Sequence, residues 1–365
     1  NLAEIGQWGP PQGFSVGANY DVTTNFTVQF DKAGTYTAEF KLVSVAKPDE
    51  ALVTGTMTID VAVSEDSAIQ VEYTKDSQSK TVYYTGLDND DRNNDHYWDV
   101  ISDLSSGYLN ADTNEPITVT LLDDITLADT TILVDAGKKV TINGNGHTIT
   151  ATMSSFAEAG KPGADAVSIT NDSTLTLNNV KLNIKAADAV VLNGETSTQG
   201  IYNDGILTLT GGTQVTINGV SKNGINGSGD ITISGENTKI EVTDVGGSAI
   251  KCDDLKADEG ATITISNTPY HGITGKNVTI QNATVSVDDA DYIGIAATGD
   301  VSVTGEGTNV TVQNSGSNGS GYPAVRVDGG FTMTDRANLT MTGNGPAESG
   351  ADFNAVRLNA VEATA

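Results

Sequence analysis

Four aromatic residues in the second half of the chain share one position relative to a short repeated pattern. Tyr270, Tyr292, Tyr322 and Phe353 each stand two residues before an Ala or Gly that is followed by Val or Ile. If the strand stays extended through this position, the side chains point outward. Aromatic rings on an outer surface can stack on the apolar faces of sugars. The aromatic residues therefore predict a carbohydrate-binding face.

A second set of side chains stands one residue after the Val or Ile of the same pattern. It contains basic and amide groups, and its members are Tyr202, Asn226, Lys251, Thr274, Ala296, Arg326 and Arg357. Arg and Asn beside aromatic rings are suited to bonding sugar hydroxyls or carboxylates. Stacked side chains on neighbouring strands also stabilise a sheet, however. The two roles are compatible, and the sequence leaves both open.

Acidic residues near the same face suggest a different chemistry. A polysaccharide lyase needs acidic ligands for Ca²⁺ and an Arg or Lys base on one face. The candidates are Lys251, Asp253, Asp254 and Arg326. Asp253 and Asp254 follow a strand directly, so we expect them in a solvated corner, with no Asp cluster on neighbouring coils. Outward acids such as Glu241 are isolated, which disfavours a hydrolase that works through paired carboxylates.

Three further groups could hold a metal or act as a nucleophile. Asp88, Asp90 and Asp91 lie in an acid-rich segment that lacks the central Gly and distal Glu of a Ca²⁺ loop, which favours a solvated loop. His271 stands in a turn without a second His nearby, so we expect no metal there. Cys252 follows Ile250 by two residues, so we expect it to be a buried apolar residue.

The repeated pattern itself predicts the fold. The pattern is a pair of residues, an Ala or Gly followed by a Val or Ile, and it occurs nine times. Most successive pairs lie roughly 22 to 31 residues apart, and a fixed period of this size indicates a solenoid. Two more short alternating runs, such as Ile231-Thr-Ile and Ile240-Glu-Val, follow most pairs. Three strands per period, joined by Gly and Asn turns, predict an all-β, right-handed, three-faced parallel β-helix, with an antiparallel sandwich as the alternative. The nine pairs are Ala166-Val167, Ala189-Val190, Gly200-Ile201, Gly224-Ile225, Ala249-Ile250, Gly272-Ile273, Gly294-Ile295, Ala324-Val325 and Ala355-Val356.

Three regions follow from these patterns. Residues 1–64 contain strands around Asp31-x-Ala33-Gly34-x-Tyr36, a stretch that resembles the tyrosine corner of bacterial immunoglobulin-like modules, which implies a small β-sandwich. Residues 65–115 contain a hairpin and an amphipathic helix predicted over 97–108, which we expect to cap the coil. Residues 116–365 form the β-helix. Because 353–358 have a first-strand pattern, we expect the native polypeptide to continue beyond Ala365.

The start of the coil carries a family resemblance. The hairpin, the helix and the runs Val119-Thr-Leu-Leu-Asp-Asp-Ile-Thr-Leu127 and Lys138-Lys-Val-Thr-Ile-Asn-Gly-Asn-Gly-His-Thr-Ile149 resemble pectate-lyase-like parallel β-helix domains. Such domains occur in bacterial cell-surface adhesin-like and carbohydrate-binding proteins. The resemblance implies the fold over residues 67–365, whereas this fold hosts lyases, hydrolases and non-catalytic binders alike.

Charge limits the class of partner. The formal net charge is −28, from 47 acidic and 19 basic residues among 365, which argues against nucleic acid. The sequence has no long apolar run, so we expect no membrane insertion. We therefore expect a non-catalytic, extracellular adhesin-like module, on a bacterial surface or secreted, that binds a polysaccharide or host glycan. A lyase or hydrolase, with Ca²⁺ as its metal in the lyase case, and a ligand-free stalk are the alternatives.

Overall fold

The computed structural model describes most of the chain after residue 33. The described residues are 34–44, 47–61, 67–86, 97–104, 109–112, 114–135, 137–153, 165–186, 198–316, 322–343 and 356–358. The chain divides into two compact units, Asn1–Val61 and Ala62–Ala365.

The described part of the first unit is one antiparallel strand pair. Strand β1 (Gly34–Ser44) pairs with β2 (Lys47–Val61) from Gly34 opposite Val61, with a register shift near Val43. Within residues 1–64 the sequence pattern predicts strands over 26–30, 36–42 and 57–63, and β1 and β2 contain most of the last two. The first, 26–30, lies outside the described residues, so the immunoglobulin-like sandwich stays a prediction.

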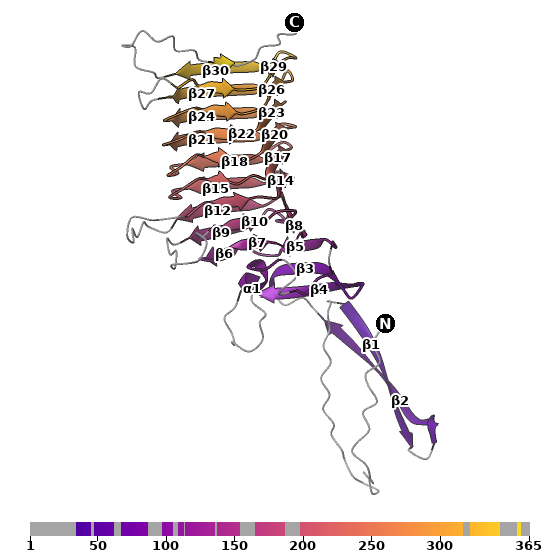
Figure 1. Cartoon of the computed structure of the whole chain (residues 1–365). Helices are drawn as coiled ribbons and strands as arrows, with labels where there is room; N and C mark the ends of the chain where they lie inside the picture. Colours follow the sequence, from indigo (N-terminus) through magenta and orange to yellow (C-terminus); the bar gives the residue numbers. More distant parts are fainter. Residues whose placement is uncertain are drawn as a thin grey trace, which may run out of the picture. The chain divides into compact units, whose positions relative to one another are not determined.

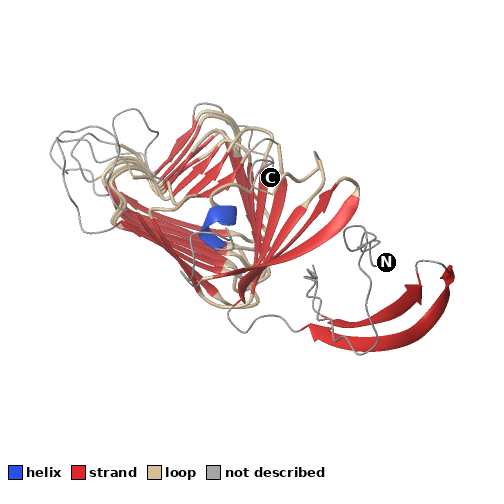
Figure 2. Cartoon of the chain, turned by 90° about the horizontal axis from the view of Figure 1, so that it is seen from below, coloured by secondary structure: helices blue, strands red, loops and turns tan. Residues whose placement is uncertain are grey.

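The second unit is a right-handed parallel β-helix, which confirms the predicted fold class. Its coils stack in a column (Figure 1), and their three sheets enclose a triangular section when viewed along the column (Figure 2). The first sheet contains β7 (Ile132–Val134), β10 (Val167–Ile169), β13 (Ile201–Asn203), β16 (Ile225–Asn226), β19 (Ile250–Lys251), β22 (Ile273–Gly275), β25 (Ile295–Ala297), β28 (Val325–Val327) and β31 (Val356–Leu358).

The other two sheets carry the longer strands of each coil. The second sheet contains β5 (Ile117–Leu121), β8 (Lys139–Asn143), β11 (Thr174–Asn178), β14 (Ile206–Thr210), β17 (Asp230–Ser234), β20 (Asp254–Asp258), β23 (Asn277–Gln281), β26 (Val301–Thr304) and β29 (Phe331–Met333), besides the hairpin described below. The third contains β6 (Ile125–Ala128), β9 (Thr148–Met153), β12 (Lys181–Ala186), β15 (Gln214–Asn218), β18 (Lys239–Thr243), β21 (Thr262–Thr268), β24 (Thr284–Ala290), β27 (Asn309–Ser315) and β30 (Asn338–Gly343).

Eight of the nine predicted pairs introduce a strand of the first sheet. The ninth, Ala189-Val190, lies outside the described residues. Strand β10 pairs directly with β13, placing Val167 beside Ile201, so these two strands belong to successive coils. The pattern missed β7, where Thr131 stands in place of the small residue. Strand β31 pairs in parallel with β28, as the predicted first-strand pattern requires, while residues 359–365 are not described.

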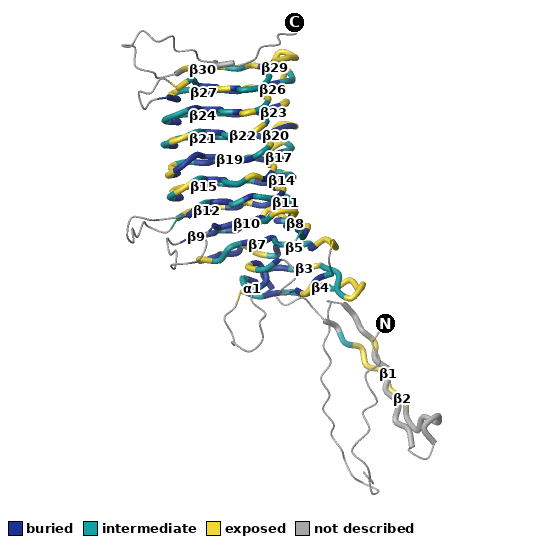
Figure 3. The backbone as a smooth tube through the Cα atoms, viewed as in Figure 1, coloured by how far each residue is buried: buried dark blue, intermediate teal, exposed yellow. Residues whose placement is uncertain are grey.

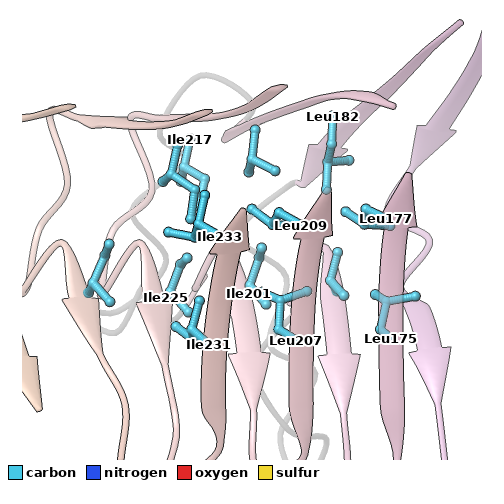
Figure 4. Close-up of a cluster of buried hydrophobic side chains, with 14 of the residues drawn as sticks. Leu175, Leu177, Leu182, Ile201, Leu207, Leu209, Ile217, Ile225, Ile231 and Ile233 are labelled. Atoms are coloured by element: carbon cyan, nitrogen blue, oxygen red, sulfur yellow. The ribbon is translucent and has the colours of Figure 1, made fainter. Parts of the chain in front are cut away.

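Alternation along each strand produces a continuous apolar core. The predicted column Ile225, Ile250, Ile273, Ile295 and Val325 is confirmed, with every member at most 2 % exposed. Leu and Ile side chains from the three sheets meet inside the coil (Figure 4), and buried residues alternate with partly exposed residues along the strands (Figure 3). The core has the period-two pattern of the sequence because each strand has one inner and one outer face.

The corner before each first-sheet strand is too tight for most side chains. A Cβ on Gly272 would lie 2.5 Å from the carbonyl oxygen of Gly294 in the next coil, and one on Gly224 would lie 2.6 Å from that of Ala249. Parallel strands lie about 4.8 Å apart, and hydrogen bonds fix that spacing. The repeated Ala or Gly therefore reflects contact between successive coils.

A hairpin and a short helix lie at the N-terminal end of the coil. Strand β3 (Ser67–Lys75) pairs antiparallel with β4 (Gln78–Thr85) and with β5. Helix α1 (Tyr97–Ile101) is shorter than predicted, because residues 102–104 are already non-helical and 105–108 are not described. The Tyr97 hydroxyl donates to Thr126 O at 2.7 Å, and Leu104 N–H donates to Leu133 O at 3.0 Å. These bonds attach the helical segment to the first coil (Figure 2).

Candidate functional site

Three tyrosines form a stacked column on the outside of the coil, which we call the tyrosine column. Tyr270 and Tyr292 have ring centroids 5.4 Å apart with an interplanar angle of 11°, and Tyr292 and Tyr322 are 4.9 Å apart at 37°. Tyr270 is 49 % exposed and Tyr322 is 36 % exposed. The prediction that these rings lie outside is confirmed. Phe353, the fourth predicted member, lies outside the described residues.

The stacking changes which part of the column can meet a sugar. Each face of Tyr292 is turned toward a neighbouring ring, so this residue presents mainly its edge and hydroxyl. Tyr270 is the first ring of the column, and among the described residues its single ring partner is Tyr292. The other face of Tyr270 has no ring against it among the described residues, and this side chain is about half exposed, so that face is open to a ligand.

A pocket of about 500 Å³ begins at Tyr270, and we call it the lysine pocket. It brings together Tyr270, Lys251 and Thr274, which belong to the two residue sets of the predicted face, with residues outside those sets. Its lining is Lys222, Asn223, Gly246, Gly247, Ser248, Lys251, Tyr270, His271 and Thr274.

The lysine pocket exists because one coil omits a side chain. Lys222, Gly247 and Tyr270 stand two residues before Gly224, Ala249 and Gly272, so they occupy the same offset on three successive coils. Lys222 and Tyr270 thus lie two coil spacings apart, roughly 9.6 Å. The middle residue is glycine, which leaves the space between them unfilled.

Hydrogen bonds hold the pocket wall in place. Ser248 N–H donates to Asn223 Oδ1 at 2.8 Å, and Asn223 Nδ2 donates to Asn226 Oδ1 at 3.0 Å. The Ile293 N–H donates to His271 Nδ1 at 3.3 Å. A neutral His271 therefore carries its proton on Nε2 and can donate from there.

The charge of the pocket comes from its two lysines. Lys222 and Lys251 are both exposed, and within the described ranges neither makes an ion pair. Burial lowers the pKa of His271, and the positive charge of Arg326 lowers it further, so this imidazole is neutral near pH 7. The Thr274 hydroxyl, also at the pocket, is buried with no hydrogen-bond partner among the described residues.

Two other predicted ligand residues are engaged by neighbours. Arg326 is exposed, but its Nε and Nη2 donate to the Asp328 carboxylate at 3.0 and 2.7 Å, which occupies the guanidinium. Arg357 is aligned with Arg326 in the strand register, and its side chain is not described. The Tyr202 hydroxyl donates to Asp204, and this hydrogen bond raises the pKa of Tyr202.

Tyr202 lines a second pocket, separate from the lysine pocket and of opposite charge. This pocket has a volume of about 630 Å³, and three of its lining residues are acidic. The residues are Asp135, Gly137, Thr170, Asn171, Asp172, Tyr202 and Asp204. The predicted binding residues are thus divided between two places on the coil.

Asp253 and Asp254, for which the sequence predicted no dense Asp cluster on neighbouring coils, are joined by one acidic residue from a neighbouring coil. Asp230 of the preceding coil joins them, and one carboxylate oxygen from each lies within 4.8 Å of the others. The three residues meet because Asp230 and Asp254 begin consecutive strands, β17 and β20. Asp254 N–H donates to Asp230 Oδ1 at 3.2 Å, so the residues also link the coils. The other metal candidates, Asp88, Asp90 and Asp91, lie outside the described residues.

Cys252 is a core residue, as predicted. It is 9 % exposed, and burial raises the pKa of its thiol to about 12. A thiol that stays protonated at physiological pH is a poor nucleophile, so the thiol contributes packing.

Comparisons with known proteins add no family to this geometry. No family model matches the chain, and neither a curated protein nor a solved structure matches it. Over the described residues, none of the helices has the length and apolar character that membrane crossing requires.

Proposed function

We propose that this chain is a non-catalytic, adhesin-like module that binds a polysaccharide or host glycan on the outer surface of its β-helix. The observation that carries the proposal is the free face of Tyr270 at the wall of the lysine pocket. A sugar ring seated in the pocket would place its apolar face on Tyr270. Polar groups beside an apolar platform are the usual composition of a small-molecule site.

The polar lining supplies bonds for sugar hydroxyls. His271 offers the Nε2 proton, and Lys222 and Lys251 offer ammonium donors. Asn223 is fixed by its bonds to Ser248 and Asn226, so the wall needs little reorganisation when a ligand enters. A site that is ordered before binding loses less entropy on association.

The proposed setting is outside the cell, either on a bacterial surface or in secreted form. In this proposal the coil resembles the pectate-lyase-like β-helices of surface proteins, residues 1–64 form an immunoglobulin-like spacer, and α1 caps the coil. The large net negative charge suits a soluble exposed protein. Protease protection of the chain on intact cells, compared with lysed cells, tests this placement.

Glycan-array binding of the whole chain tests the function. Tyr270→Ala should weaken binding of the best glycan roughly tenfold or more, since base- and sugar-sized rings stacked on aromatic groups are held by about 1–3 kcal/mol. Tyr322→Ala, at the other end of the tyrosine column, is the matched control and should bind normally. Equal binding by both variants would contradict the pocket proposal, and an array without any bound glycan would leave the coil as a structural stalk.

A polysaccharide lyase is the second candidate, favoured by the Asp230, Asp253 and Asp254 cluster. Lys276 Nζ lies 4.0 Å from Asp253 Oδ2, so a basic group adjoins the carboxylates. Incubation with polygalacturonate and Ca²⁺, with release of unsaturated product as the readout, tests this alternative. Product that disappears in Asp254→Asn would establish it, and absence of product at high enzyme concentration would remove it.

A further inference from the structure

The lysine pocket has a local charge opposite to that of the protein. The chain contains 47 acidic residues and carries a net charge of −28, yet none of the nine residues that line this pocket is acidic. Two of the nine are lysines. The second pocket, by contrast, has Asp135, Asp172 and Asp204 in its lining. A cleft lined by one sign of charge raises the local concentration of ligands of the opposite sign.

The two lysines line the pocket from different coils. Lys222 precedes β16, and Lys251 is the second residue of β19 on the next coil. Tyr270, which precedes β22 on the following coil, lines the opposite side of the pocket from Lys222. The side chain that would separate Lys222 from Tyr270 is absent at Gly247, where a Cβ would lie 2.3 Å from Asn223 Oδ1. Lys222 and Lys251 thus line a pocket in which Gly247, packed against Asn223, contributes no side chain.

The donors of the pocket outnumber its acceptors. An ammonium group has three donors and no acceptor, and a neutral His271 donates from Nε2 because Nδ1 already accepts the Ile293 N–H. The amide oxygen of Asn223 is used by Ser248 N–H. A set of this kind bonds best to a group made of acceptor oxygens with negative charge.

We infer that the lysine pocket binds the acidic group of a sugar, a carboxylate or a sulfate ester, whose ring stacks on Tyr270. The inference rests on the proposed function and narrows its ligands to acidic glycans. Carboxylate and sulfate share the required chemistry, because both present several charged oxygens to ammonium donors. Lys222 and Lys251 are then the residues that distinguish acidic from neutral sugars.

The test uses the whole chain and pairs of oligosaccharides that differ in charge alone. One arm compares uronic-acid and sialic-acid oligosaccharides with their carboxyl-reduced forms, and the other compares sulfated oligosaccharides with their desulfated forms. We expect the acidic member of at least one pair to bind roughly tenfold more tightly. The preference should fall as salt rises from about 0.05 to 0.5 M, since exposed charges are screened.

Variants identify the residues. Lys222→Gln with Lys251→Gln should weaken binding of the acidic partner to the level of its neutral counterpart, and Lys181→Gln, an exposed lysine on the third sheet, should leave the preference unchanged. If neutral and acidic partners bind equally to the parent chain, the inference is overturned although glycan binding survives. If the preference persists in the double variant, the lysine pocket is not its source. If no oligosaccharide binds, the proposed function fails as well.

Discussion

The buried carboxyl of Asp165 allows a quantitative test of the corner packing. Asp165 precedes the Ala166 corner and is 9 % exposed. Burial raises the pKa of Asp165 from 3.8 to about 6, against a smaller opposing effect of the Gln199 hydrogen bonds and the Lys222 charge. One pKa unit corresponds to about 1.4 kcal/mol, so above pH 6 the ionised carboxyl destabilises the fold by about 3 kcal/mol.

The sign and the pH window follow from linkage. Because the folded pKa is raised, the stability that Asp165 contributes is fully present below pH 3.8 and is lost as the pH rises through about 6. Asp165→Asn keeps the shape and does not ionise, so it should be more stable than the parent by about 1.6 kcal/mol at pH 5 and by about 3 kcal/mol at pH 8. The difference should level off above about pH 7.

Urea unfolding at several pH values between about 5 and 8 measures this difference and stays above the sequence pI of 4.1, where solubility is lowest. Comparing variants at the transition midpoint avoids a long extrapolation, which matters because stacked repeats need not unfold in one step. Asp172→Asn is the control, since it removes the same charge at an exposed site in the same coil. Parallel pH profiles for the two variants would refute the argument that burial shifts Asp165.

Three shorter predictions test the remaining features. Ile273→Ala should lower the free energy of unfolding by about 2–5 kcal/mol, because fixed strand spacing prevents the cavity from closing, while Thr279→Ala on the outer face should cost much less. Gly272→Ala should destabilise the coil by about 1–3 kcal/mol, measured by thermal unfolding, because its Cβ would contact the carbonyl of Gly294; a neutral result would contradict the corner geometry. Asp254→Asn should raise the free energy of unfolding by up to about 1 kcal/mol in low salt with EDTA, because it relieves repulsion among the three carboxylates. If this increase in stability persists in high salt, repulsion is not its cause, since salt screens exposed charges.

The architecture could be predicted because a solenoid repeats its constraints. Each coil must place a small residue where backbones meet and apolar residues inside, so Gly272-Ile273 and its counterparts record the register directly. The pattern failed where one coil departs from the rule, because Thr131 stands in place of the small residue before β7.

The site was harder to predict because it depends on differences between coils. Tyr270 stands two residues before the small residue of its coil, and the same position is Gly247 in the preceding coil and Lys222 in the coil before that. Comparing this position between coils would have shown that the aromatic column ends at a gap beside a basic residue. The pairing of Arg326 with Asp328 was also visible in principle, since residues two apart on a strand share a face. The acidic cluster was not visible from one coil, because Asp230 joins Asp253 and Asp254 through stacking.

The gap at Gly247 explains how a regular coil can acquire a specific site. Stacked coils repeat side chains at a fixed spacing, and an unbroken tyrosine column would cover its own ring faces. A glycine at one offset ends the column and exposes one face of Tyr270, while the Asn223 contact prevents any side chain from filling the space. The same contact places Asn223 against Ser248, so the wall is rigid. In the proposed site, recognition would therefore depend on one omitted side chain, and the repeats around it hold the neighbouring groups in position.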